Sequence, residues 1–157
     1  ASECLNAGNV FIEGSQVKAC EFVEIPKRAS AAHATEQCYR SYRDSLFCLH
    51  PSGDSLTRKS FFDGIVSGCI PVVFDKRWQD EYSLHLPEDW RSFSILSQPL
   101  GFLQKLSTLP RHEIISLQAA TVALIPRVVY ARPGSQQGLF QDAASLLIAA
   151  SVRPGYL

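Results

Sequence analysis

The chain has 157 residues, which is the length of one domain and enough to bury a hydrophobic core. Its hydrophobic content of 46% and charged content of 19% are typical of a globular protein and exclude extended disorder. Fifteen Lys and Arg residues balance fifteen Asp and Glu residues, which excludes a broad basic surface for nucleic acid or an anionic membrane. Any anion site must therefore be local.

The first part of the chain, residues 1–33, is predicted to be irregular because glycines and Pro26 interrupt it. A helix is expected over residues 34–43. The short apolar run at residues 46–49, which a His-Pro pair ends, predicts a buried strand.

The next segment, residues 57–67, has the apolar spacing of an amphipathic helix. Thr57 is the predicted N-cap and Gly68 the predicted C-cap. The apolar run at residues 70–74 then predicts a second buried strand. Two buried strands joined by a helix predict a parallel pair, and hence an α/β fold.

The rest of the chain continues this alternation. A third strand is expected at residues 92–96 and a short helix at 99–107. A longer helix is expected at residues 110–131, kinked at Pro126, and a final amphipathic helix at 140–150.

The five cysteines follow no CxxC spacing, and the histidines do not cluster near them, so no metal site is predicted. Cys48 and Cys69 lie in apolar runs and are predicted to be buried thiols. Cys4 and Cys20 flank a glycine-containing loop and would pair in an oxidising compartment. The absence of methionine predicts that the chain is an excised or processed piece.

The loop after the first strand, residues 50–59, carries hydroxyl groups and two cations where the helix is expected to begin. Arg58 and Lys59 are unfavourable at a helix N-terminus, which carries a partial positive charge. A bound anion would reverse that effect, and a guanidinium group is well suited to phosphate. The pattern therefore favours an anion site, the alternative being a solvated Lys59 paired with Asp63.

A stripe of small and polar residues runs along the same helix, beside its apolar face: Ser60, Asp63, Gly64 and Ser67. Such a stripe would let a ligand lie close to the backbone, with Asp63 accepting hydrogen bonds from ribose hydroxyls. Close packing against a neighbouring element is the alternative. No GxGxxG, GxxxxGK[ST] or GxSxG motif is present, which disfavours dinucleotide dehydrogenases, P-loop NTPases and α/β-hydrolases.

The run FCLHPSGDSLTRKSFFDGIVSGCIPVVF at residues 47–74 resembles the exostosin-like glycosyltransferases (GT47), and especially their plant xyloglucan galactosyltransferase branch. The pattern of that branch is FCL, one or two residues, P-x-GDS-x-T-R, an FD helix and GCIPV. The resemblance extends over residues 37–150. Residues 76–82 depart from the relatives, so the resemblance does not identify the sugar.

The resemblance implies a Rossmann-like parallel sheet forming the C-terminal, donor-binding half of a glycosyltransferase of GT-B architecture. Residues 34–157 would be this nucleotide-sugar-binding domain, and residues 1–33 would join it to an acceptor domain nearer the N-terminus. The residues carried over to the UDP-sugar site are Gly53, Asp54, Ser55, Thr57, Arg58, Lys59 and Asp63. Four of these would meet the diphosphate: Ser55, Thr57, Arg58 and Lys59. Asp63 would meet the nucleoside.

The reaction that the resemblance implies is an inverting transfer from a UDP-sugar to a glycan or polysaccharide acceptor. The catalytic base would belong to the N-terminal domain of the same protein, and no cofactor or metal ion is expected. The resemblance also implies a type II membrane protein in the Golgi lumen. A competing hypothesis is a non-catalytic scaffold or interaction domain that retains the fold, and a weaker one is another Rossmann-like nucleotide-binding protein.

Overall fold

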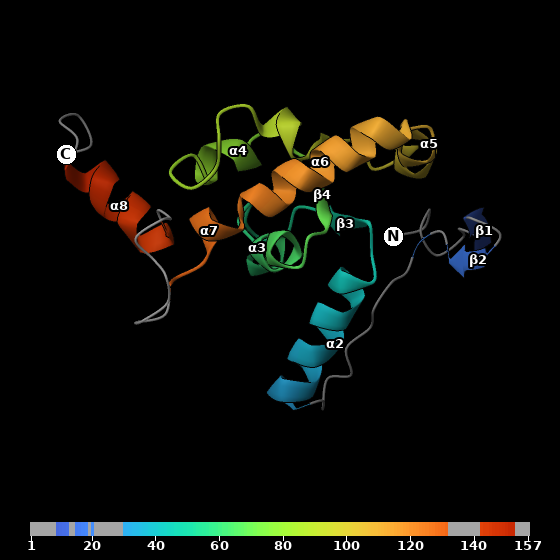
Figure 1. Ribbon diagram of the computed structural model, residues 1–157, viewed down its shortest axis with the longest axis horizontal. Coiled ribbons are helices and arrows are strands. Elements are labelled where there is room, and N and C mark those ends of the chain that lie inside the picture. Colours follow the sequence, from blue (N-terminus) through green and yellow to red (C-terminus); the bar gives the residue numbers. More distant parts are fainter. Residues whose placement is uncertain (1–8, 13–14, 19, 21–29, 132–141, 153–157) are drawn as a thin grey trace.

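The computed structural model describes residues 9–12, 15–18, 20, 30–131 and 142–152. Helices and strands alternate along the chain, as predicted (Figure 1). The strands are β1 Asn9–Ile12, β2 Ser15–Lys18, β3 Phe47–His50, β4 Ile70–Val73 and β5 Ile95–Leu96. The helices are α2 Ala31–Arg43, α3 Lys59–Val66, α4 Trp78–Glu81, the 3₁₀ helix η1 Trp90–Ser92, α5 Phe102–Ser107, α6 Arg111–Ala123, α7 Ile125–Val128 and α8 Ala143–Val152.

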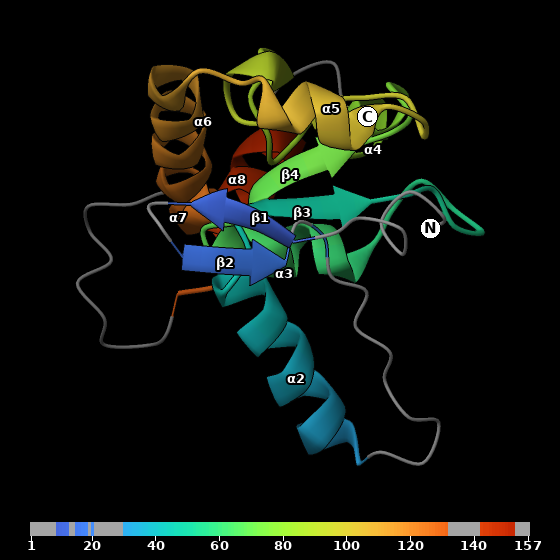
Figure 2. The same ribbon diagram turned by 90° about the vertical axis from the view of Figure 1, so that its right-hand side faces the viewer.

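A three-stranded parallel sheet with the order β3-β4-β5 lies at the centre. Phe47 pairs with Ile70 and His50 with Val73, so β3 and β4 end at the same edge of the sheet (Figure 2). The central strand β4 is buried along its whole length, as expected for a parallel strand covered on both faces. The predicted parallel pair and the α/β class are therefore confirmed.

Alternate residues of β4 belong to two hydrophobic clusters. Val73 packs with Phe61 and Ile65 of α3 on one face of the sheet. On the other face, Ile70 and Val72 pack with side chains of α5 and α6. The sheet therefore lies between α3 and the α5–α6 pair, and the loop after β3 leads directly into α3 at the strand ends.

Helix α3 is shorter than predicted, because Arg58 and not Thr57 is its N-cap. The Thr57 hydroxyl lies 3.2 Å from that of Ser55. The Tyr82 hydroxyl accepts a hydrogen bond of 2.7 Å from the Arg58 amide, so a contact remote in sequence satisfies this end of the helix. The C-cap is Ser67 and not the predicted Gly68, which follows it with φ +76°, a left-handed conformation that glycine favours after a helix end.

The N-terminal part contains more regular structure than predicted. Strands β1 and β2 form an antiparallel pair separated by two residues, a spacing typical of hairpins. Helix α2 begins at Ala31, and the Ser30 side chain caps it by accepting a hydrogen bond from the His33 amide. No residue of α2 is fully buried, and the helix projects from the sheet (Figure 1).

The C-terminal elements differ from the predictions mainly at their ends. The third strand is only Ile95–Leu96, because Ser92 ends η1 and the amides of Phe93 and Ser94 donate hydrogen bonds back to the Trp90 carbonyl. Helix α5 begins at Phe102, after Gly101 with φ +80°, and not at Pro99. The long helix divides into α6 and α7 at Leu124, two residues before Pro126. Its predicted last residues, beyond Val128, are not helical.

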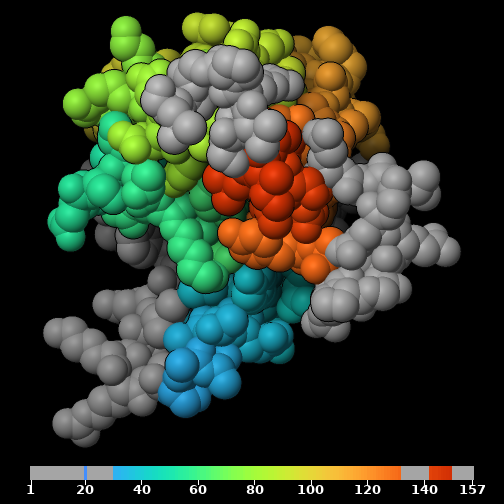
Figure 3. Space-filling view, turned by 90° about the vertical axis from the view of Figure 1, so that its left-hand side faces the viewer, coloured from blue at the N-terminus to red at the C-terminus, as the bar shows by residue number. Residues whose placement is uncertain are grey.

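The final helix, α8, packs against α7 (Figure 3). Asp142 lies before its first residue, and one carboxylate oxygen accepts hydrogen bonds from the amide and hydroxyl of Ser145. The predicted start at residue 140 lies outside the described residues. No helix in the described part of the chain is long and apolar enough to cross a membrane.

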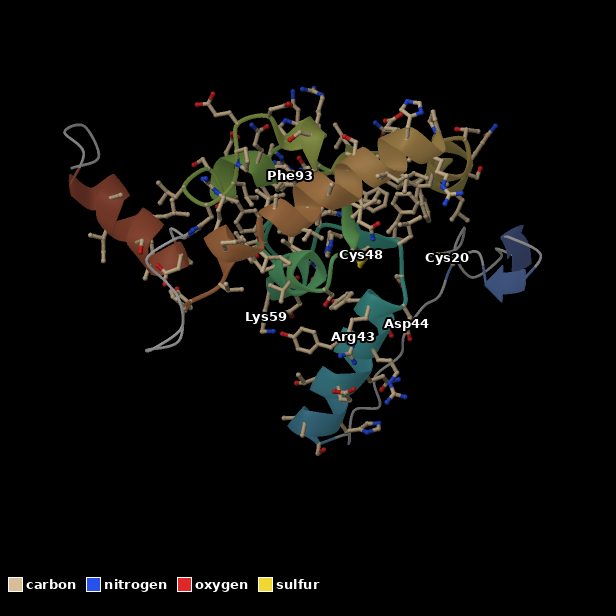
Figure 4. All side chains as sticks on the ribbon, in the orientation of Figure 1. Cys20, Arg43, Asp44, Cys48, Lys59 and Phe93 are labelled. Atoms are coloured by element: carbon tan, nitrogen blue, oxygen red, sulfur yellow. A yellow bond between two sulfur atoms is a disulfide. The ribbon has the colours of Figure 1, made fainter. Side chains whose placement is uncertain are left out.

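The prediction of buried thiols at Cys48 and Cys69 is wrong, because these two residues form a disulfide (Figure 4). Both side chains are buried, and their Cα atoms are 5.8 Å apart. The parallel register places the start of β3 beside the start of β4, which brings the two cysteines together. Cys20 is also disulfide-bonded, whereas its predicted partner Cys4 lies outside the described residues. Cys38 is a free thiol.

Candidate functional site

A pocket lies at the carboxyl ends of β3 and β4, the edge of a parallel sheet where ligands of open α/β folds bind. Its walls come from the ends of the two strands, the loop after β3, the start of α3 and the region of α4. The lining residues are His50, Pro51, Ser52, Leu56, Arg58, Phe61, Val73, Phe74, Asp75, Trp78 and Tyr82. Of the seven predicted site residues, only Arg58 is among them.

The Arg58 guanidinium folds back over the loop and lies directly against Gly53. A Cβ atom at residue 53 would overlap the guanidinium nitrogen Nη2 and lie 2.9 Å from Cζ. Gly53 does not have a positive φ, so the backbone conformation does not require a glycine here. The absent side chain instead leaves space for Arg58 at the rim of the pocket.

The remaining loop residues make contacts among themselves. The Ser55 hydroxyl donates a hydrogen bond of 3.0 Å to the Thr57 carbonyl, and the Gly53 amide donates to the Ser55 carbonyl. Asp54 is exposed. At the start of α3, the Arg58 amide is bound to Tyr82. Within the described chain, the Lys59 amide has no hydrogen-bond acceptor, so it remains a donor at the helix N-terminus.

Lys59 and Asp63 lie apart from the pocket, at the contact between α3 and α2. Lys59 Nζ is 2.7 Å from both carboxylate oxygens of Asp63, which confirms the ion pair that was considered as the alternative for Lys59. The Tyr39 hydroxyl of α2 donates a hydrogen bond of 3.1 Å to the same carboxylate. This bond is the main cause of the raised pKa of Tyr39. In Figure 4, Lys59 extends from α3 toward α2.

The small-residue stripe of α3 packs against neighbouring elements, as its alternative interpretation required. A Cβ atom at Gly64 would lie 3.4 Å from His50 Nε2 and 3.6 Å from Cys48 Cβ, so Gly64 allows α3 to approach β3 closely. The Ser67 hydroxyl donates to the Asp63 carbonyl. Ser60 lies close to Tyr42 of α2. The stripe is therefore part of the protein interior and of the α2 contact.

His50, the last residue of β3, is the pocket residue that sequence reasoning missed, because it was interpreted only as the end of a strand. Its side chain is 8% exposed, and neither ring nitrogen has a hydrogen-bond partner among the described residues. Burial, and secondly the cation of Arg58, lower its pKa from 6.5 to about 4. The imidazole is therefore neutral at neutral pH, with one nitrogen a donor and the other an acceptor.

Aromatic side chains line the pocket beside His50. Phe61 stacks on Tyr82 with ring centroids 5.2 Å apart, and Trp78 lies 4.9 Å from Phe61. Trp78 and Tyr82 come from residues 76–82, the segment to which the family resemblance did not extend. Asp75, at the rim, is hydrogen-bonded by Arg77, which lowers its pKa to about 2. No cluster of three potential metal ligands occurs among the described residues.

Comparison with known proteins identifies the family. Residues 9–111 match the exostosin GT47 domain. The chain is 31% identical over 141 residues to the xyloglucan galactosyltransferase MUR3 of Arabidopsis thaliana, covering 85% of this chain and 22% of that protein. It is 34% identical over 145 residues to the probable xyloglucan galactosyltransferase GT19 of the same plant, covering 85% and 33%.

A third relative from Arabidopsis thaliana, xyloglucan-specific galacturonosyltransferase 1, is 36% identical over 118 residues, covering 69% of this chain and 18% of that protein. The chain thus spans a third or less of the length of these relatives. No solved structure matches it. The domain match covers well over half of the chain and includes the loop, α3 and both strands of the pocket. The chain therefore belongs to the exostosin GT47 family of glycosyltransferases.

Proposed function

We propose that this chain is the donor-binding, Rossmann-like half of an inverting glycosyltransferase of GT-B architecture, and that its pocket binds the diphosphate of a UDP-sugar. The observation that carries the proposal is the Arg58 guanidinium held over Gly53 beside the N-terminus of α3. A planar cation and the Lys59 amide at a helix N-terminus together suit a diphosphate. A galactose donor is the first choice, because two of the relatives are named galactosyltransferases.

In the proposed reaction, an acceptor hydroxyl attacks the anomeric carbon while a base from the N-terminal domain of the same protein removes its proton. The bond to the departing diphosphate breaks, and negative charge collects on the phosphate oxygens. Arg58 and the α3 N-terminus would stabilise that charge. The acceptor is a polysaccharide or glycan, and no metal ion or cofactor takes part in the proposal.

The disulfide between Cys48 and Cys69 supports a lumenal location for the proposed enzyme. Disulfides persist in the oxidising compartments of the secretory pathway and are rare in the cytosol. The disulfide therefore agrees with the Golgi lumen as the proposed location. A type II membrane anchor would belong to another part of the protein.

Calorimetric titration of UDP into the chain tests the proposal. We expect Arg58→Ala to weaken UDP binding by about 10- to 100-fold, because a charge-assisted hydrogen bond to phosphate is lost. Arg58→Lys retains the charge without the planar fork and should have an intermediate affinity. No binding at millimolar UDP by the folded chain would overturn the proposal in favour of a scaffold domain.

The role of Asp63 as a ribose ligand is part of the same proposal. Its carboxylate already binds Lys59 and Tyr39, so a ribose would have to share or displace these partners. We expect Asp63→Ala to weaken the binding of UDP but not of inorganic pyrophosphate. Tyr39→Phe, which removes only the hydroxyl group, is the matched control for the α2 contact. Equal losses for UDP and pyrophosphate in Asp63→Ala would refute the ribose assignment.

Gly53→Ala provides a second test of the Arg58 geometry. A methyl group at residue 53 must displace the guanidinium, which is the end of a flexible side chain on the surface. We therefore expect thermal unfolding to change little while UDP affinity falls about as far as in Arg58→Lys. In the Arg58→Ala background the same substitution should have no further effect on affinity. Undiminished UDP binding by Gly53→Ala would show that the observed Arg58 position is not the binding position.

A further inference from the structure

The wall of the pocket contains a buried histidine whose two ring nitrogens make no hydrogen bond to the described residues. His50 lies at the carboxyl end of β3, and neither of its ring nitrogens has a hydrogen-bond partner among the described residues. Buried polar groups in proteins are nearly always hydrogen-bonded, and those without partners are costly to keep. Burial removes water from the His50 ring nitrogens, and no hydrogen bond from the described residues takes its place.

Packing fixes the position of the His50 ring. Phe61 contacts it edge to face, with ring centroids 5.3 Å apart. Gly64 of α3 leaves space beside Nε2 and Cε1, where a larger residue would press against the ring. A strand end, an aromatic ring and a glycine therefore hold a neutral imidazole at the wall of the pocket.

The charged groups around His50 indicate which kind of ligand group would contact its imidazole. Arg58 lines the same pocket, and α3 begins beside it. Both favour a negatively charged group. The Asp75 carboxylate accepts hydrogen bonds from Arg77 and makes none with His50. A neutral imidazole can donate one hydrogen bond to a phosphate oxygen while Arg58 supplies the charge.

We infer that His50 is a phosphate-binding residue of the pocket, donating an imidazole N–H to the diphosphate of the nucleotide alongside Arg58. This inference rests on the proposed function and adds a residue to its site. Its contribution is directional, since a neutral hydrogen bond orients the diphosphate without adding charge. The bound phosphate in turn supplies the partner that the buried ring lacks.

Three variants and three ligands test the inference. His50→Leu fills the site with an apolar side chain, His50→Gln retains an N–H donor, and His112→Leu is a control at an exposed histidine of α6. We expect His50→Leu to lose about tenfold in affinity for both UDP and pyrophosphate, with His50→Gln restoring most of it. Binding of uridine, which has no phosphate, should be unchanged in every variant.

Nuclear magnetic resonance of ¹⁵N-labelled histidine distinguishes phosphate binding by His50 from a purely structural role, because only direct binding should change the imidazole resonances. UDP and pyrophosphate should each shift the His50 imidazole resonances, whereas uridine should not. If UDP binds with the expected dependence on Arg58 but leaves the His50 resonances and the His50→Leu affinity unchanged, the inference is wrong and the proposed function stands. If the folded chain binds neither UDP nor pyrophosphate, both are overturned.

Discussion

Removing the Cys48–Cys69 disulfide by a double substitution to alanine should lower the free energy of unfolding by about 3 kcal/mol. The two cysteines are 21 residues apart in sequence, and cross-linking a segment of that length restricts the unfolded chain by about this amount. Both side chains are buried, so their replacement also leaves small cavities that add to the loss. Denaturant unfolding of the oxidised protein and of the variant measures the difference.

The free thiol of Cys38 offers a matched control for this experiment. Cys38→Ala should change the unfolding free energy far less than the double substitution, because no cross-link is lost. Addition of a reductant should destabilise the original protein more than the double variant, which keeps the disulfide at Cys20 but has already lost the Cys48–Cys69 bond. Equal stability of the oxidised and reduced proteins would show that the bond does not restrict the unfolded chain.

Acidification from pH 6.5 to pH 4 should cost the folded chain about 3 kcal/mol through His50 alone. Its pKa is about 4 in the folded state, against an ordinary value of 6.5, so the unfolded chain binds a proton in this window and the folded chain does not. The stabilising contribution is complete above pH 6.5 and falls as the pH decreases toward 4. Below pH 4 both states are protonated at His50 and the loss ends.

The groups that face His50 do not titrate in the same window. Asp75 and Tyr82 line the pocket with His50: the pKa of Asp75 is about 2, and burial raises the pKa of Tyr82 above its usual 10. His50→Gln should therefore remove most of the slope between pH 4 and 6.5, as measured by denaturant unfolding at intervals across this range. A slope as steep in His50→Gln as in the original chain would assign the pH dependence to other residues.

The fold was predictable from the sequence where local patterns determine it. The apolar runs of β3 and β4 and the amphipathic spacing of α3 gave the parallel pair and the α/β class. The N-cap of α3 was not predictable, because the Tyr82 hydroxyl, 24 residues away, satisfies the Arg58 amide. The disulfide likewise depends on strand register, which no pattern in the separate segments of Cys48 and Cys69 encodes.

The candidate site was predictable only in part. Cations at a helix start suggested an anion site in the loop, which stays a prediction, and the structure holds Arg58 over Gly53 there. The same reasoning placed Lys59 and Asp63 with them, whereas the contact with Tyr39 turns that pair toward α2. His50 was missed because a histidine after a strand has no signature of its own. Its importance comes from burial without a partner, which only three-dimensional contacts reveal.

The covalent link between Cys48 and Cys69 makes the segment from residue 48 to residue 69 a closed ring. This ring contains the whole loop that follows β3 and all of α3. A protease that cuts one peptide bond inside it opens the ring without dividing the protein, since the two fragments stay joined through sulfur. Only such a cut together with reduction would break every covalent link between β3 and β4, the strand that follows α3.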